Sequence, residues 1–136
     1  MTERRWAPAL ILVLTALAVT GLYRSRPLPQ AERFVADHGA ELEAALERGG
    51  GIPARIGYQV CNLWRNGEMA EFILSAWGDT YCGCYYSRQD VPFPFQGADV
   101  PLTQAEDGRW TWSAEGDDHG VTWKLRDNWY YFEAGF

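Results

Sequence analysis

Apolar and polar positions divide the chain into three regions with different periods. Residues 6–23 contain no charged side chain, residues 30–48 repeat apolar side chains at steps of three and four, and much of the chain from residue 55 onward alternates them at steps of two. Steps of three and four are typical of an amphipathic helix, and a step of two is typical of a strand with one buried face. The pattern therefore predicts an apolar N-terminal helix, one amphipathic helix and a β-sheet.

The apolar segment at residues 6–23 is long enough to cross a membrane. As a helix it extends about 27 Å, close to the roughly 30 Å hydrocarbon core of a bilayer. Trp6 and Tyr23 stand at its two ends, where amphipathic rings favour the interface, and arginines flank it on both sides. We expect a single-pass membrane anchor formed by residues 6–23, with the C-terminal domain on the extracytoplasmic side.

Two alternatives to an anchor stay open. Ala16-Leu17-Ala18 has the small-x-small pattern that a signal peptidase reads, which predicts secretion after cleavage. A buried helix of a soluble protein is the other, although such helices usually keep a polar face. With either a membrane anchor or a cleaved signal peptide, the chain divides into two parts. Residues 1–26 are the anchor or signal segment, and residues 27–136 are an extracytoplasmic domain.

The helical period at residues 30–48 predicts the one helix of that domain. Gly49-Gly50-Gly51 supplies a residue that ends a helix with a positive φ. Before the helix, Pro27-Leu28-Pro29 is expected to form a stiff spacer. The positions on the apolar side of the helix are Ala31, Phe34, Val35, His38, Leu42, Ala45 and Leu46.

The strongest β signal is Asn66-Gly67, a preferred hairpin turn, between alternating residues 55–65 and 68–77. It predicts a register that places Trp64 opposite Met69. Both faces of this hairpin are largely apolar, so we expect it to be central and covered on both sides. Further strands are expected at residues 80–87, 110–113, 121–126 and 129–132, with a proline-containing loop at residues 90–108.

These elements predict the α+β fold class. The expected architecture is one N-terminal amphipathic helix packed on an antiparallel β-sheet of about five to six strands, preceded by a single hydrophobic (transmembrane or signal) helix. After residue 23 the chain has 10 basic and 17 acidic residues, a net charge of −7. A domain of that sign repels phosphate backbones, so nucleic acid is not an expected partner.

Cys82-Gly83-Cys84 is the first candidate for chemistry. Side chains at i and i+2 of a strand share a face, with Cα atoms about 6.5–7 Å apart, at or beyond the limit for an unstrained disulfide. The pair is therefore either two small buried side chains or a reducible redox pair. A structural disulfide that uses Cys61 is a third interpretation. Zinc bound by Cys61, Cys82, Cys84 and His119 is a fourth.

An acidic loop, residues 115–120, joins two of the expected strands. Asp117, Asp118 and His119 in this loop could bind a cation or work as an acid–base pair. The ligand spacing of a calcium loop is absent, and no nucleophile lies beside them in the sequence. A solvated hairpin loop, with Asp and Gly chosen for turn geometry, explains the same residues.

Aromatic residues are unusually frequent, with 7 Trp, 7 Tyr and 6 Phe. Trp110, Trp112 and Trp123 fall in the inward register of alternating strands and are expected in the core. A second group is harder to place on one buried side, and if exposed together it would form a stacking surface for sugar rings or a protein. This group consists of Trp64, Trp77, Trp129, Tyr130 and Tyr131.

The sequence thus predicts a membrane-tethered extracytoplasmic binding or protein-interaction module, with no cofactor and no catalytic activity, because no catalytic set of residues converges in it. Its ligand would be a protein or a carbohydrate, and the binding candidates are Trp129, Tyr130, Tyr131, Asp117 and Asp118. The alternative is a thiol-redox or zinc-binding protein built on the Cys82-Gly83-Cys84 motif.

Overall fold

The computed structural model describes residues 15–19, 22, 26–49 and 60–136. Within these ranges one long helix, α2 (Pro27–Glu47), precedes a single antiparallel sheet of seven strands. The strands are β1 (Val60–Trp64), β2 (Met69–Trp77), β3 (Thr80–Ser87), β4 (Thr103–Gln104), β5 (Trp110–Ser113), β6 (His119–Arg126) and β7 (Trp129–Gly135). Their order across the sheet is β1-β2-β3-β7-β6-β5-β4. The α+β class is confirmed.

The sheet has seven strands and not the expected five to six, and the strand that was not predicted is the short β4. This strand lies inside the region predicted as a loop, and its two residues pair with Trp110 and Thr111 of β5. Both of its side chains are exposed. A two-residue strand with no buried side chain has no apolar alternation, which is why the sequence pattern does not reveal it.

Helix α2 begins at Pro27, three residues before the predicted start, so the expected stiff spacer is in fact its first turn. Proline is tolerated there because the backbone N–H groups of a first helical turn have no partner within the helix. The extra turn also brings Leu28 against the core. Gly49, with a φ of 65°, follows the helix and lets the chain turn away.

The predicted register of the first hairpin is confirmed, since Trp64 pairs with Met69 and Cys61 pairs with Phe72. The connection is a short 3-10 turn, η1 (Arg65–Gly67), in which both Arg65 and Asn66 have positive φ. The expectation that this hairpin is central is wrong for its first strand. β1 forms an edge of the sheet, and the Leu63 side chain on it is 59% exposed.

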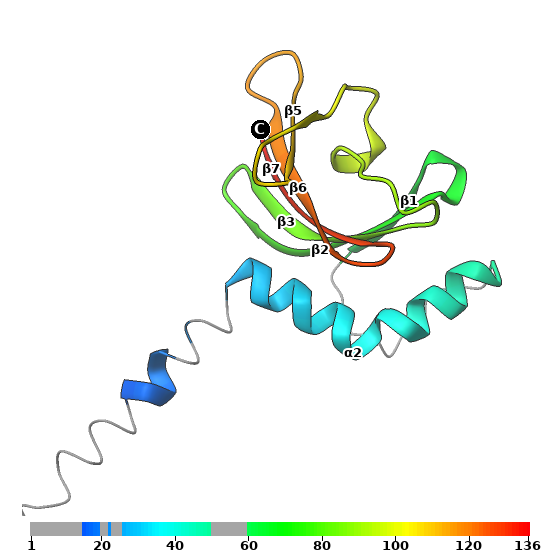
Figure 1. Cartoon of the computed structure of the whole chain (residues 1–136). Coiled ribbons are helices and arrows are strands. Elements are labelled where there is room, and N and C mark those ends of the chain that lie inside the picture. Colours follow the sequence, from blue (N-terminus) through cyan, green and yellow to red (C-terminus); the bar gives the residue numbers. More distant parts are fainter. Residues whose placement is uncertain (1–14, 20–21, 23–25, 50–59) are drawn as a thin grey trace, which may run out of the picture.

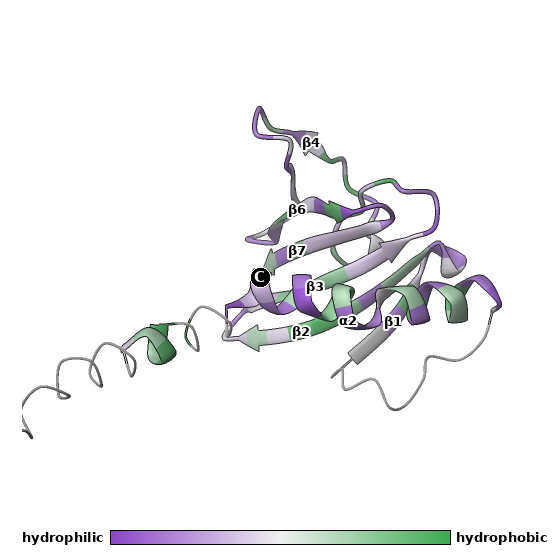
Figure 2. Cartoon of the chain, turned by 60° about the horizontal axis from the view of Figure 1, so that its bottom comes forward, coloured by the Kyte–Doolittle hydropathy of each residue, from purple (hydrophilic) through white to green (hydrophobic). Residues whose placement is uncertain are grey.

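The sheet is strongly curved, with α2 across one face and the loop that follows β3 against the other (Figure 1). We call these the α2 face and the loop face. The amphipathic character of α2 is visible in Figure 2, where polar and apolar segments alternate along the helix that crosses the sheet. Core residues on the α2 face include Phe34, Leu42, Phe72, Trp129 and Tyr131. Those on the loop face include Tyr85, Phe95, Trp112, Tyr130 and Phe132.

Acidic residues of α2 tie the helix to the sheet. The carboxylate of Glu43 accepts hydrogen bonds from the Trp129 indole (2.6 Å) and from the Arg126 guanidinium (2.9 Å). One turn later, Glu47 accepts a hydrogen bond from the Tyr86 hydroxyl at 2.9 Å. These carboxylates look like ordinary surface residues in the sequence, yet they provide partners for polar groups of large aromatic side chains.

The predicted membrane segment falls mostly outside the described residues. Of residues 6–23, the structure describes only 15–19 and 22, and these are helical. Across the ranges that are described, no helix combines the length and the apolar content needed to span a bilayer.

Candidate functional site

The structure buries three of the predicted binding residues. Trp129, Tyr130 and Tyr131 lie on the central strand β7 and are at most 2% exposed. Their side chains alternate between the two core clusters, Trp129 and Tyr131 on the α2 face and Tyr130 on the loop face. The expected stacking surface made of these residues is therefore wrong, because this part of β7 is covered on both faces of the sheet.

Cys82 and Cys84 share one face of β3, as predicted, and that face is the buried α2 face. Both residues are thiols with no exposed surface. Burial raises the pKa of the Cys82 thiol to about 11. Reactive cysteines are partly exposed and have a lowered pKa, so this environment disfavours a redox role and favours packing as small apolar side chains.

Gly83 separates the two thiols for a steric reason. A Cβ atom added there would overlap the carbonyl oxygen of Phe72 on β2 and reach the ring of Phe132 at 3.0 Å. The register of β2 against β3 also shifts here, between Ile73 and Ser75. Close approach of two strands explains the glycine without any bend toward a disulfide.

The predicted zinc ligands do not converge in the part of the chain that can be assessed. His119 on β6 is separated from Cys82 on β3 by strand β7, a lateral distance of about 10 Å. No group of three or more His, Cys, Asp or Glu residues suited to a metal ion occurs among the described residues. The side chain of Cys61 lies outside them.

The Asp117–His119 pair is held through the backbone. Nδ1 of His119 lies 2.6 Å from the carbonyl oxygen of Asp117, so this nitrogen carries the proton and donates. The carboxylates of Asp117 and Asp118 form no described hydrogen bond with the ring. In neutral His119, Nε2 is left as a hydrogen-bond acceptor.

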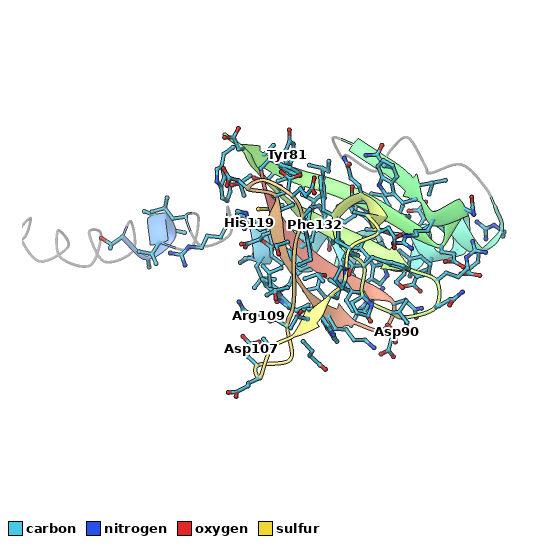
Figure 3. All side chains as sticks on the ribbon, turned by 90° about the horizontal axis from the view of Figure 1, so that it is seen from above. Tyr81, Asp90, Asp107, Arg109, His119 and Phe132 are labelled. Atoms are coloured by element: carbon cyan, nitrogen blue, oxygen red, sulfur yellow. The ribbon has the colours of Figure 1, made fainter. Side chains whose placement is uncertain are left out.

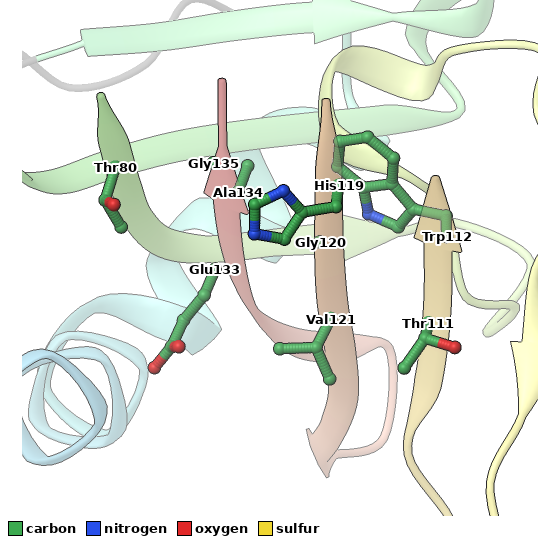
Figure 4. A pocket seen from close by; sticks show the side chains of 9 residues that line it. All are labelled: Thr80, Thr111, Trp112, His119, Gly120, Val121, Glu133, Ala134 and Gly135. Atoms are coloured by element: carbon green, nitrogen blue, oxygen red, sulfur yellow. The ribbon is translucent and has the colours of Figure 1, made fainter. Parts of the chain in front are cut away.

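His119 lines an open cleft of about 450 Å³ at one end of the sheet (Figure 4). This volume is within the range of small-molecule sites. Viewed from above, His119 lies at the end of the sheet opposite to Asp90, with Phe132 between them (Figure 3). The lining residues come from four strands and are Thr80, Thr111, Trp112, His119, Gly120, Val121, Glu133, Ala134 and Gly135.

Strand pairing places six of the nine lining residues in two rows on the α2 face. Side chains on opposed residues of neighbouring strands share a face. The first row runs Trp77, Thr80, Gly135, His119, Ser113 across β2, β3, β7, β6 and β5. The second row contains Glu133, Val121 and Thr111, and the buried Cys82 continues it on β3. None of the lining residues belongs to α2, so this end of the face is left open by the helix.

Two glycines form the cleft. A Cβ atom on Gly135 would lie 2.8 Å from Cε1 of His119, so the imidazole rests over a residue that has no side chain. Gly120 is covered on the loop face by the indole of Trp112, which backs the cleft from behind. Larger residues at these positions would fill the space or displace the rings that shape it.

The polar groups in the cleft are mainly hydrogen-bond acceptors. Glu133 accepts a hydrogen bond of 2.8 Å from the Tyr131 hydroxyl through Oε1. None of the ion pairs among the described residues involves Glu133. The hydroxyls of Thr80 and Thr111 add groups that both donate and accept. This combination suits a ligand rich in hydrogen-bond donors.

Comparisons with known proteins give no match. No protein-family model matches the chain, and no curated protein or solved structure is significantly similar to it.

Of the residues around the cleft, His119 was predicted as a ligand candidate, and Trp77 was among the aromatic residues considered for a stacking surface. Glu133, Thr80 and Gly135 were not predicted, because β3 and β7 are neighbours in the sheet but lie almost fifty residues apart in the chain. The only available signal was the small residue pair Ala134-Gly135 at the end of an aromatic strand.

Proposed function

We propose that this protein is a membrane-tethered extracytoplasmic binding module without catalytic activity, and that the cleft beside His119 is its ligand site. The observation that carries the proposal is the cleft itself, an open space with a carboxylate, an imidazole and two hydroxyls on a rigid sheet. Sites built on strands hold their polar groups in fixed positions, which favours selective binding.

Two observations support the membrane tether: the apolar segment at residues 6–23, and the exposure of those of its apolar side chains that the structure describes. Leu17, Val19 and Leu22 are 64%, 59% and 70% exposed. Apolar side chains in such a continuous run are stable when lipid rather than water covers them. The net charge of −7 after this segment favours a domain that stays clear of an anionic membrane surface.

The absence of catalytic activity is supported by the chemistry of the cleft. Its lining has one carboxylate and one imidazole and contains no cysteine or serine nucleophile. The imidazole is oriented by a backbone carbonyl, whereas a general base of a nucleophile is usually oriented by a carboxylate. These groups can orient a ligand by hydrogen bonds.

Protease accessibility on whole cells, with the mature N terminus sequenced from the same sample, tests the proposal. We expect external protease to digest residues 27–136 and the undigested chain to retain residues 6–23 in the membrane fraction. A full-length chain that is protected from protease in intact cells and fractionates as a freely soluble species would contradict the tether. If the domain is found outside the cell without residues 6–23, this segment is a cleaved signal peptide and not an anchor.

A further inference from the structure

We infer that the cleft binds a primary ammonium group on an aliphatic chain, with the Glu133 carboxylate as its counter-charge and Nε2 of His119 as the acceptor for a second donor. This inference rests on the proposed function and names the ligand class of the same site. It depends on three observations: the environment of the Glu133 carboxylate, the composition of the cleft lining, and the distribution of charge over the two ends of the sheet.

Glu133 is one of two acidic residues on the described strands, and the two are in opposite situations. Glu71 is fully buried and accepts hydrogen bonds from the backbone of Gln96 and from the indole of Trp64. Glu133 lines the cleft and accepts one hydrogen bond, from the hydroxyl of the buried Tyr131. No ion pair within the described ranges includes Glu133. A carboxylate that faces a cavity without a cationic partner favours a cationic ligand.

The lining of the cleft fits an ammonium group better than other charged groups. None of its residues is a lysine or an arginine, so an anion would meet Glu133 with no counter-charge beside it. A metal ion needs several ligands, and Glu133 is the one carboxylate in the lining. A guanidinium is best matched by two free carboxylate oxygens, and Oε1 of Glu133 already accepts the Tyr131 hydroxyl. A compact ammonium needs fewer acceptors.

Charge is distributed unevenly between the two ends of the sheet. The cleft is at the end where β2 turns into β3 and β5 turns into β6, and the acidic residues of these turns are Asp79, Glu115, Asp117 and Asp118. Basic residues near the opposite end, beside the β1–β2 and β6–β7 turns and the end of β3, are Arg65, Arg88, Lys124 and Arg126. A cation that approaches the cleft is therefore attracted by the acidic domain and does not meet these basic groups.

The positions of the two acceptors predict a ligand with donors at both ends of an apolar chain. The His119 ring rests over Gly135, which is two residues from Glu133 on β7, so these two side-chain positions are about 7 Å apart. In Figure 4 the Glu133 side chain points away from His119. Val121 pairs with Glu133 and adds apolar surface beside it. An aliphatic diamine, or a lysine side chain with its backbone N–H group, has this arrangement of donors.

Isothermal titration of the full-length chain in phosphatidylcholine nanodiscs, with empty nanodiscs as the blank, tests the inference. The probes are cadaverine, an end-blocked Gly-Lys-Gly peptide, and pentanediol, which has hydroxyls in place of the amino groups of cadaverine. We expect saturable binding of cadaverine, of the peptide or of both, at least about tenfold tighter than that of pentanediol. Binding of cadaverine alone would identify a free amine as the ligand, and binding of the peptide alone would identify a lysine side chain of a partner protein.

Two variants act on the Glu133 carboxylate in different ways. Glu133→Gln removes its charge and should weaken binding at least about tenfold, because the charge-assisted hydrogen bond is lost. Val121→Lys keeps the carboxylate but places an ammonium group on the residue directly opposite, so it should abolish binding by taking the place of the ligand. His119→Ala removes the second acceptor and should weaken binding by about threefold or more.

Matched controls separate an effect at the cleft from an effect of net charge. Glu106→Gln removes an exposed carboxylate from the β4–β5 turn, and Gln104→Lys adds a cation at an exposed position of β4. Neither residue lines the cleft. Neither substitution should change the affinity by more than about twofold, because solvent and salt screen exposed charges. Far-ultraviolet circular dichroism of each variant verifies that the fold is kept.

Three results would overturn the inference: no saturable binding of cadaverine or of the peptide, pentanediol that binds as tightly as cadaverine, or a Glu133→Gln variant that binds as well as Glu106→Gln. Such a failure is distinguishable from failure of the proposed function, because the membrane tether and the outside location are measured by protease accessibility. If those hold while both amines fail, the tethered module stands and the ammonium ligand is rejected.

Discussion

Glu71 on β2 accepts a 2.9 Å hydrogen bond from the backbone N–H of Gln96, which joins the sheet to the loop that packs on its loop face. The other carboxyl oxygen accepts a hydrogen bond from the Trp64 indole at 3.3 Å. Glu71 is fully buried, and no ion pair among the described residues includes it. Burial therefore raises its pKa to about 7 despite the two donors.

This carboxyl group predicts a pH-dependent stability. The unfolded pKa is near 4.5 and the folded pKa is about 7, so the folded state holds the proton more tightly than the unfolded state. The stabilisation is complete below the unfolded pKa and is lost as the pH rises from about 4.5 through about 7, by at most about 3 kcal/mol. Urea denaturation between pH 4.5 and 8 measures this loss.

Glu71→Gln supplies the comparison, because the amide keeps an acceptor for Gln96 but cannot ionise. The free energy of unfolding of the wild type should fall relative to that of Glu71→Gln across this range. Glu106→Gln, at an exposed turn, should follow the wild type. Parallel curves for the wild type and Glu71→Gln would show that Glu71 does not titrate near neutral pH in the fold.

Gly83→Ala should be strongly destabilising. The added Cβ atom would overlap the backbone carbonyl of Phe72, and a backbone atom can move only if β2 and β3 separate. We expect a loss of about 2–3 kcal/mol or more in the free energy of unfolding, measured by urea denaturation. Gly39→Ala is the control, since its Cβ meets mainly the mobile guanidinium of Arg126 and should cost less. Equal losses in the two variants would argue against the close strand contact.

Glu43→Ala should lower stability by about 1–3 kcal/mol, because the Trp129 indole N–H loses its acceptor in a buried position. The Arg126 guanidinium loses the same partner, although its exposure makes that contribution small. Asp37→Ala, at an exposed position of the same helix, should change the free energy of unfolding by less than about 0.5 kcal/mol. Thermal or urea unfolding that gives equal values for both variants would contradict this account of the helix contact.

The thiols of Cys82 and Cys84 should be protected from alkylation in the folded protein. Both are buried, and the thiolate that reacts is disfavoured by the raised pKa of Cys82. In a Cys61→Ser background, iodoacetamide at pH 8 should add no mass in buffer and two adducts in urea. Rapid alkylation in buffer, or a disulfide between the two residues, would contradict this prediction and support a redox role for Cys82 and Cys84.

The sequence predicted those features that depend on neighbours in the chain. The register of Trp64 with Met69 follows from one turn and an alternating pattern, and it is confirmed. The environment of Tyr130 and Tyr131 depends instead on strands placed on both sides of β7, and the order β3-β7-β6 cannot be derived from local periodicity. The same order creates the cleft, which is why His119 was recognised and its neighbours Glu133 and Gly135 were not.

Pro27 and Glu71 show a second kind of limit. Pro27 predicted a break before the helix, but a proline in the first turn of a helix removes no helical hydrogen bond. Its effect therefore depended on the residue at which the helix begins, which the apolar pattern did not define. Glu71 has the polar identity of a surface residue, and only the loop folded over it makes it a buried group. Local pattern alone identifies neither case.

The central claim is an accessible cleft on the far side of a membrane, and labelling of Ser113→Cys tests it most directly. Ser113 is exposed and pairs with His119 at the end of the first row. In a Cys61→Ser background, a membrane-impermeant maleimide should label this variant in intact cells and leave the parent unlabelled. Labelling that requires cell lysis would place the cleft inside the cell and contradict the account.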